Sequence, residues 1–317
     1  MTQATVGRRK DFLSVLDFDA ADLEHCLDLS AQVKADRALG LRAPTAQALN
    51  GRHVAMLFDK PSLRTRTTFE IAIRELGGHI VALQPDVALG RREPVADVAR
   101  NLERWVDAVV IRTFSQQMIQ EFASAAPRLH VINALTDEEH PCQAIADFLT
   151  LREHLGPLKG RTIAFVGDGN NIAASIAHAA AMLGVNCHVA SPVPYQLKPV
   201  VVQQATRVAR HGARLRLFSD PASAVAGADA VYTDVWTSMG QEAETEIRRK
   251  AFAGFQVNED LMAAAKPGAM FMHCLPAHRG EEVTAGVFES DASVVFDQAE
   301  NRLHGQKALL LMLLARS

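Results

Sequence analysis

The chain has 317 residues, of which 48% are hydrophobic and 22% are charged, and its formal net charge at pH 7 is −3. This composition is typical of a globular protein, and the length suits two domains of about 150 residues each. The small negative charge excludes the strongly basic surface by which nucleic-acid-binding proteins attract their partner, so we expect no nucleic acid partner.

The cysteines and the apolar tracts bear on where the protein works. The cysteines are widely spaced, with no C-x-x-C pair, which disfavours a disulfide framework and a zinc site and fits the reducing cytoplasm. Residues 1–12 contain a basic cluster with no apolar segment after it, so they do not resemble a secretory signal. The most apolar tract, residues 308–315, is too short to cross a bilayer, and we expect no membrane partner. The cysteines are Cys26, Cys142, Cys187 and Cys274.

Along the chain, apolar runs of strand length alternate with segments of helical periodicity. A helix is predicted first, and Gly40 marks its end. In the first half, the predicted helices cover residues 19–39, 62–76, 95–105 and 141–154, and the predicted strands cover residues 53–58, 79–83, 108–114 and 130–135. In the second half, the predicted strands cover residues 162–167, 186–191, 214–218, 230–234, 269–275 and 293–297, and the helices cover residues 171–183, a segment ending near His211, and residues 300–315.

Strands that alternate with helices predict an α/β protein with parallel sheets. The segment "LGPLKG", residues 155–160, reads as a turn, and the alternation restarts after it. We therefore predict two tandem domains, residues 1–150 and 151–317, each a parallel sheet flanked by helices.

Polar clusters follow the predicted strands at their carboxyl ends, where ligands bind in α/β folds. Six such clusters are too many to be explained as ordinary loops. They are residues 59–66, Arg112, residues 136–143, residues 167–171, residues 234–240 and residues 273–282.

The first cluster, "DKPSLRTR", suits a phosphate group. Ser62, Arg64 and Thr65 open a predicted helix, whose backbone N–H groups, hydroxyls and guanidinium match a phosphate dianion. A serine N-cap with solvated arginines is the alternative. Because two arginines one residue apart point differently, we expect Arg64 to face the ligand and Arg66 to hold the loop.

Two further clusters of the first half offer donors. Arg112 follows four apolar residues, where a charge is unusual, although a structural salt bridge would also explain it. His140 and Gln143 are three residues apart at a helix start, so both can face one ligand. The histidine could donate to a carbonyl oxygen, and a purely structural histidine is the alternative.

The cluster "VGDGNN" after the first strand of the second half resembles a dinucleotide loop only weakly. Gly167 and Gly169 fit G-x-G-x-x-G, but Ile172 occupies the third position. A nicotinamide-dependent dehydrogenase is disfavoured further, because Ser191 and Pro192 stand where an acidic ribose ligand would be expected. Asn170 and Asn171 could instead bind carboxylate or ammonium groups.

The two remaining clusters and the last predicted helix each supply one further candidate residue. Asp234 is a candidate partner for a substrate ammonium, or a turn cap. Cys274 could be a nucleophile, although no Cys–His–Asp order accompanies it. Arg302, near the start of the last predicted helix, is a candidate anion contact or a surface charge.

Taken together, these motifs resemble the ornithine carbamoyltransferases over nearly the whole chain. "SLRTR" and "HPCQ" alone are shared with the wider group that includes the aspartate enzymes, whereas "DVWTSMGQE" and "HCLPAHRGEEV" point to ornithine, and "GDGNN" and "FDQAENRLH" complete the set. The resemblance implies transfer of the carbamoyl group of carbamoyl phosphate to the δ-amine of L-ornithine, giving L-citrulline and phosphate in arginine biosynthesis. It also implies a trimer, no metal and no cofactor, and a last helix, about residues 300–317, that returns to the first domain.

The resemblance also implies roles for individual residues. Arg112, His140, Asp234 and Cys274 would be catalytic. Carbamoyl phosphate would be bound by Ser62, Leu63, Arg64, Thr65, Arg112, His140, Gln143, Cys274, Leu275 and Arg302. Ornithine would be bound by Asn171, Asp234, Ser238 and Met239.

The chain departs from the family pattern at two positions. Leu63 replaces a threonine that many members have, and Ala88 stands where many carry a glutamine that reaches a neighbouring subunit's substrate; Arg91 or Arg92 could serve instead. Three alternatives follow: another acceptor such as acetylornithine, putrescine or aspartate, a catabolic direction, and a catalytically silent homologue.

Overall fold

The structure is a computed structural model that describes residues 10–85 and 92–315. The chain divides into two compact units: one contains residues up to Ala146 together with residues from Asn301, and the other contains Asp147–Glu300. Ala88 and Arg91 lie outside the described residues. None of the helices within the described ranges is both long and apolar enough to cross a bilayer.

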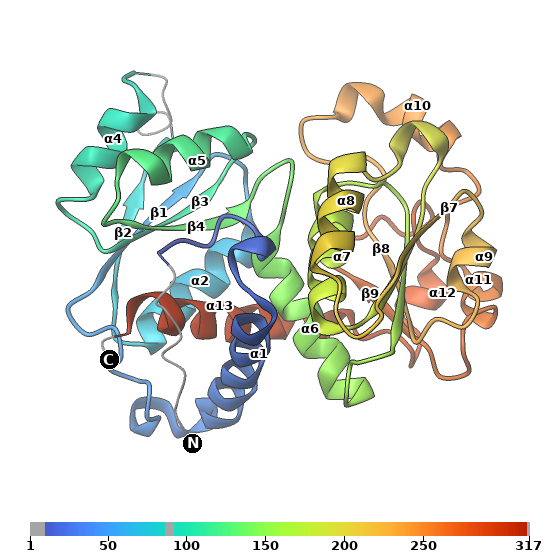
Figure 1. Cartoon of the computed structure of the whole chain (residues 1–317), viewed down its shortest axis with the longest axis horizontal. Coiled ribbons are helices and arrows are strands. Elements are labelled where there is room, and N and C mark those ends of the chain that lie inside the picture. Colours follow the sequence, from blue (N-terminus) through green and yellow to red (C-terminus); the bar gives the residue numbers. More distant parts are fainter. Residues whose placement is uncertain (1–9, 86–91, 316–317) are drawn as a thin grey trace. The chain divides into compact units, whose positions relative to one another are not determined.

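The first unit is built on a parallel sheet with strand order β2-β1-β3-β4 (Figure 1). Alternate strand residues face opposite sides, and α4 and α5 cover one side with an apolar cluster that includes Leu57, Ile111 and Phe122. Figure 1 shows α1, α2 and the end of α13 on the other side. The strands are β1 (His53–Phe58), β2 (His79–Leu83), β3 (Ala108–Arg112) and β4 (His130–Leu135), and the helices are α1 (Ala20–Ala35), α2 (Leu63–Glu75), α4 (Val95–Leu102), α5 (Gln116–Ala125) and the start of α6 (Pro141–Leu155).

The second unit is built on a five-stranded parallel sheet with order β7-β6-β5-β8-β9. In Figure 1, α7 and α8 lie on one side of this sheet and α9, α11 and α12 on the other. The strands are β5 (Thr162–Val166), β6 (Asn186–Ala190), β7 (Leu215–Phe218), β8 (Ala230–Thr233) and β9 (Met270–His273). The helices are α7 (Asn171–Leu183), α8 (Pro199–Val208), α9 (Pro221–Val225), α10 (Thr245–Ala251), α11 (Glu259–Ala263), α12 (Ala285–Phe288) and α13 (Val295–Leu314).

These two parallel sheets confirm the predicted fold class. The last helix also behaves as expected, because α13 begins in the second unit and ends in the first. There Lys307 Nζ lies 3.0 Å from Glu75 Oε2 of α2, and Asn301 accepts a hydrogen bond from Lys34 of α1 at 2.8 Å.

Each sheet has a position at which the strand order reverses, and this position is where polar loops converge. In the first unit β1 lies between β2 and β3, and in the second β5 lies between β6 and β8. Loops leaving neighbouring strands in opposite directions open a crevice at the carboxyl edge. The clusters after β1 and β5 therefore occupy the ligand-binding position of their own sheet.

Two predicted elements were wrong. The helix predicted over residues 19–39 ends at Ala35 and continues as a 3-10 segment, Asp36–Arg42, in which Gly40 has φ +56°. The strand predicted over residues 293–297 is absent: Ser293 forms an isolated bridge with Phe271, and α13 begins at Val295, five residues earlier than expected. The run "SVVF" has strand propensity, but burial of Val295 at the helix start decides its conformation.

Candidate active site

The start of α2 forms the centre of the polar cluster in the first unit. Ser62 is the N-cap: its backbone is extended, and its side-chain oxygen accepts a hydrogen bond from the Thr65 N–H at 3.2 Å. The capped serine of the alternative interpretation is therefore present, and the positive end of the helix dipole faces the site where we expected an anion. Leu63 is 77% exposed at the first position of the helix.

Arg302 reaches this cluster from α13. It is buried, and its Nη2 donates a hydrogen bond to the hydroxyl of Thr65, which is buried as well. The alternative of a surface charge is therefore wrong for Arg302. Because the Thr65 oxygen accepts this bond, its own O–H proton can be donated elsewhere.

His140 lies close to two cations at the same sheet edge. It is buried at the start of α6, and burial, reinforced by the positive charges of Arg302 and Arg112, holds the pKa of its imidazole well below the usual value. The ring is therefore neutral at pH 7, with one nitrogen that donates and one that accepts. Gln143, one turn along α6, is buried too.

Lys60 is a residue of this unit that sequence reasoning missed. It is only 5% exposed, and its Nζ donates to Asp137 Oδ1 at 2.6 Å and lies 4.0 Å from the centroid of the Phe114 ring. These contacts join the loops that follow β1, β3 and β4. The sequence signal was a lysine two residues after a buried strand, where a charge needs a partner.

Arg66 does not hold the loop, contrary to our expectation. Its Nε donates to Glu70 Oε1 at 3.0 Å, one turn along the same helix. Both side chains of this pair are substantially exposed. The pair joins two successive turns on the surface of α2 and does not connect the helix to the loop before it.

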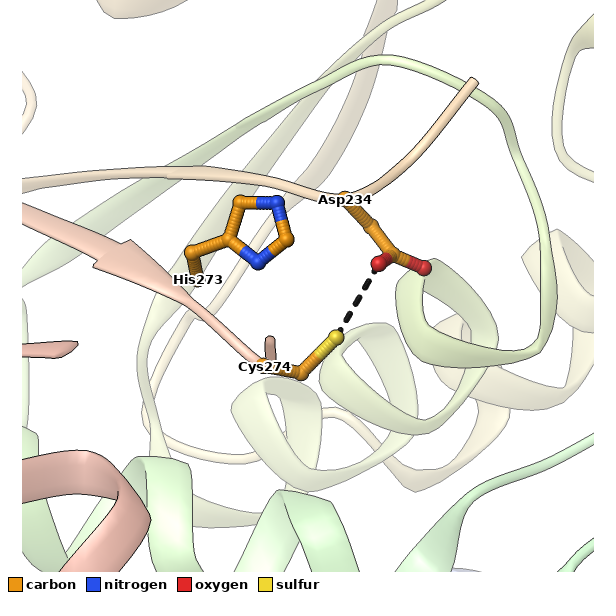
Figure 2. A group of neighbouring side chains, drawn as sticks. All are labelled: Asp234, His273 and Cys274. Carbon is orange, nitrogen blue, oxygen red and sulfur yellow. Dashed lines mark hydrogen bonds between the residues drawn. The ribbon is translucent and has the colours of Figure 1, made fainter. Parts of the chain in front are cut away.

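Asp234 is the centre of the polar cluster in the second unit. It is buried directly after β8, and its two carboxylate oxygens have different partners: Oδ1 accepts from Cys274 Sγ at 3.0 Å (Figure 2), and Oδ2 accepts from Asn170 Nδ2 at 2.8 Å. Both partners are neutral, so the carboxylate charge is not cancelled by either contact. Asn170 also caps α7, whose first residue is Asn171. Asn170 was not among the residues that the family resemblance implied for ornithine binding.

The loop after Asp234 is held by side chains that follow it. The Ser238 N–H donates to Gln241 Oε1 at 3.1 Å, and the Gly240 N–H donates to Glu242 Oε1 at 3.0 Å, while Met239 is 44% exposed. The buried Arg248 secures the base of the loop by donating to the Trp236 carbonyl at 3.0 Å and to Asp168 at 2.7 Å.

His273 shapes the segment that carries Cys274. Its Nδ1 accepts the Leu275 N–H at 2.8 Å, so Nε2 carries the proton and donates to Glu282 Oε1 at 3.2 Å. Leu275 adopts a left-handed backbone with φ +61°. The ligand atoms of Asp234, His273 and Cys274 lie within 4.8 Å of one another, but both ring nitrogens are engaged, so this donor set does not fit a resident metal ion.

The glycine loop after β5 is filled by the protein itself. A Cβ at Gly169 would lie 2.3 Å from the Leu197 nitrogen and 2.8 Å from the Tyr195 oxygen, and the Gly169 N–H donates to that same oxygen at 2.7 Å. In a dinucleotide fold the second glycine instead lets the backbone approach a pyrophosphate. This packing disfavours the dehydrogenase alternative.

Comparison with known proteins identifies the family. Residues 10–153 match the sequence model of the aspartate/ornithine carbamoyltransferase carbamoyl-P binding domain, and residues 159–313 match that of the Asp/Orn binding domain. The chain belongs to the aspartate/ornithine carbamoyltransferase family. The family resemblance expected from the motifs is thereby confirmed.

Individual carbamoyltransferases are similar to the chain over nearly its whole length. An ornithine carbamoyltransferase of Anoxybacillus flavithermus is 49% identical over 316 residues, 99% of both chains. The crystal structure of the ornithine carbamoyltransferase from Pyrococcus furiosus has a TM-score of 0.92 at 46% identity, covering 96% of this chain and 97% of the other. That of an anabolic ornithine carbamoyltransferase from Campylobacter jejuni has a TM-score of 0.89 at 37% identity, covering 96% and 98%.

Proposed function

We propose that the chain is an ornithine carbamoyltransferase, which transfers the carbamoyl group of carbamoyl phosphate to the δ-amine of L-ornithine and releases L-citrulline and phosphate. The observation that carries the proposal is the buried Asp234 carboxylate, held by Cys274 and Asn170. A buried anion with neutral partners suits a substrate that brings an ammonium group.

The first unit would bind carbamoyl phosphate, with its domain at residues 1–150. Ser62, Leu63, Arg64 and Thr65 would hold the phosphate at the helix start, where backbone N–H groups and the helix dipole favour an anion. Arg112 would bridge the phosphate and carbonyl oxygens. His140, Gln143 and Arg302 would contact the carbamoyl group, and the neutral state of His140 supports donation of a hydrogen bond to its oxygen.

The second unit would bind ornithine, with its domain at residues 151–317 apart from the end of the last helix. Asn171, Asp234, Ser238 and Met239 would hold the amino-acid end. Cys274 and Leu275 would lie near the carbamoyl group.

Chemistry would begin with loss of a proton from the δ-ammonium, because an alkylammonium of pKa about 10.4 is not nucleophilic at pH 7. The cations that bind carbamoyl phosphate would favour this loss, and Asp234 and Cys274 would assist it. Attack on the carbamoyl carbon creates an oxyanion, which Arg112, His140 and Thr65 would stabilise as pre-positioned donors. Expulsion of phosphate then gives citrulline, and the remaining acceleration comes from orienting two polar substrates.

Three finer assignments belong to the proposal: a role in arginine biosynthesis, a cytoplasmic location and a homotrimeric assembly. The similarity to an enzyme described as anabolic supports the first. The widely spaced cysteines support the second. The third rests on the family resemblance, and light scattering of the purified protein would test it.

A citrulline-forming assay with an acceptor panel tests the function. Carbamoyl phosphate would be offered with ornithine, acetylornithine, putrescine and aspartate, and phosphorolysis of citrulline would be measured separately. We expect turnover with ornithine to exceed that with acetylornithine by at least about a hundredfold, because the acetylated amine would leave the buried charge unpaired. Turnover with putrescine and with aspartate should also be lower than with ornithine. Preference for another acceptor, or no turnover at all, would overturn the proposal.

A further inference from the structure

The backbone N–H groups on the outer edge of β9 find their hydrogen-bond acceptors in an unusual way. β9 is the last strand of its sheet, so the N–H groups on its outer side have no full strand beside them. The chain at residues 292–294 supplies one pair of bonds, from the Phe271 N–H to the Ala292 oxygen at 2.8 Å and from the Val294 N–H to the Phe271 oxygen at 3.0 Å. α13 then begins at Val295, and in the part of the chain that the structure describes no further backbone hydrogen bond to the outer side of β9 follows.

A side chain takes the place of the missing strand. The next outward N–H, that of His273, donates to Gln298 Oε1 at 3.0 Å. Gln298 projects from the first turn of α13 and is fully buried. The carboxamide thus provides the acceptor that a sixth strand would have provided, one residue before Cys274.

The other end of the same carboxamide is also engaged. Gln298 Nε2 donates to Asp147 Oδ1 at 2.6 Å and to the Tyr232 hydroxyl oxygen at 3.0 Å. Burial, together with the negative charge of Asp147, raises the pKa of Tyr232 well above its usual value, so the hydroxyl stays protonated and donates to Asp147 at 3.4 Å. Tyr232 and Asp147 are both fully buried.

These bonds require an amide at position 298. A carboxylate would accept from His273 but could not donate to Asp147, and an apolar side chain would do neither. The network joins β9 one residue before Cys274 to β8 two residues before Asp234. These are the two strand ends that carry the hydrogen-bonded thiol and carboxylate of Figure 2.

We propose that Gln298 is a positioning residue, which aligns the ends of β8 and β9 and thereby holds the Cys274 thiol on the Asp234 carboxylate. Its effect on catalysis rests on the proposed function. Its effect on the thiol does not, and the two can be measured separately.

Thiol alkylation provides the direct test. Parent protein, Gln298→Asn and Gln298→Met would be treated with iodoacetamide at pH 7, and modification of each cysteine followed by mass spectrometry. Asn keeps the amide but is one carbon too short to span both sets of partners. Gln203→Met, on an exposed position of α8, is the matched control.

A thiol released from a carboxylate ionises more readily and is less shielded. We therefore expect Cys274 alkylation to be roughly fivefold faster in both Gln298 variants, because the loss of one hydrogen bond changes an equilibrium by about that factor. The rate should be unchanged in the control. The other three cysteines are buried and report folding, because they stay unreactive only in a folded protein. An unchanged Cys274 rate in a folded Gln298 variant would overturn the proposal.

Should both variants unfold and expose all four cysteines, Tyr232→Phe keeps the test decisive. It removes one hydroxyl from the network without a change in shape, and a smaller acceleration at Cys274 is expected; no acceleration there would refute the network's role. In the citrulline assay, the Gln298 variants should lower kcat with ornithine more than they change KM for carbamoyl phosphate. Absence of turnover in the parent would refute the proposed function, while the alkylation result would still decide the role of Gln298.

Discussion

The polar clusters of the two units are built with opposite charge. In the first unit, two arginines lie close enough to a buried imidazole to depress its pKa, and one of them donates to Thr65. In the second, a buried carboxylate has two neutral partners. A cationic cluster stabilises a phosphate and a developing oxyanion, whereas an anionic one attracts an ammonium group. The difference teaches that the two clusters offer opposite charges, which is the arrangement that the proposed function needs for an anionic and a cationic substrate group.

The two units hold their loops by similar means. Lys60 joins three strand-end loops of the first sheet through Asp137 and the Phe114 ring. In the second unit, Arg248 joins the loop after β5 to the loop after β8. In each unit, the side chain of a buried cation contacts more than one of the loops that follow strands. These contacts hold the polar loops in place, and neither cation is among the residues that we propose to bind substrate.

The largest expected effect separates two arginines of one helix. Arg64→Ala should lower kcat/KM for carbamoyl phosphate about a thousandfold, because the guanidinium that we propose to bind the phosphate would be lost. Arg66→Ala should stay within about threefold, since its partner is the exposed Glu70. Steady-state kinetics with varied carbamoyl phosphate would measure both. Equal damage from the two substitutions would break the assignment of the first unit.

The negative charge of the second unit's cluster is tested by Asp234→Asn. The change keeps the shape but removes the charge, so kcat/KM for ornithine should fall about a hundredfold. Binding of carbamoyl phosphate alone, measured by calorimetry, should be unaffected. Ornithine kinetics like those of the parent would contradict the role of Asp234.

A smaller effect is expected from Lys60→Met. Methionine fills the space over the Phe114 ring but cannot bond to Asp137, so the loops after β1 and β4 should separate. We expect KM for carbamoyl phosphate to rise about tenfold, which is the equivalent of roughly 1.4 kcal/mol, with KM for ornithine nearly unchanged. Lys159→Met, an exposed lysine of the other unit, is the control. Comparable increases in both KM values would show that Lys60 supports the fold in general.

The smallest effect concerns the pH dependence of stability. The pKa of His140 is lower in the folded protein than in the unfolded chain, where it is about 6.5, so the unfolded state gains a proton first as the pH falls. His140 should therefore cost no stability above pH 6.5 and destabilise the fold below it, by at most about 1.4 kcal/mol per pH unit. His140→Asn should lack this loss, and urea titrations of both proteins between pH 5 and 8 would show whether the difference is confined to the acidic side.

The spacing of apolar residues along the sequence predicted most of the longer strands and helices that the structure contains. Residues 130–135 and 171–183 were predicted with the bounds that the structure has, because one is a mostly apolar run of strand length and the other follows an asparagine cap. Prediction failed at residues 293–297, where the buried Val295 begins α13 instead of continuing a strand. The helices α9, α11 and α12 were not predicted, since four or five residues are too few to show a helical period, and the longer helices α5 and α10 were missed as well.

The candidate site divides in the same way. Arg112, which ends β3, and Asp234, which follows β8, were identified because a charged group beside a buried strand costs free energy unless it has a partner. His140 was identified from its spacing to Gln143 at a helix start. These patterns did not identify Lys60 or Gln298, whose hydrogen-bond partners lie between 25 and 151 residues away in the chain. The assignment of Arg66 to the loop failed for the related reason that Glu70, four residues on, offered a nearer partner.

By itself, the sequence determined the fold class, most of the strands and longer helices along the chain, and the motifs that mark the family. These follow from periodicity and from residue types at fixed spacings, which are local properties. Only the tertiary structure decided which side chains share a hydrogen bond, that Arg302 is buried against Thr65, and that Gln298 completes the edge of β9. Hydrogen bonds between residues distant in the chain depend on burial and on the direction of each side chain, and both arise only when the sheets and helices pack.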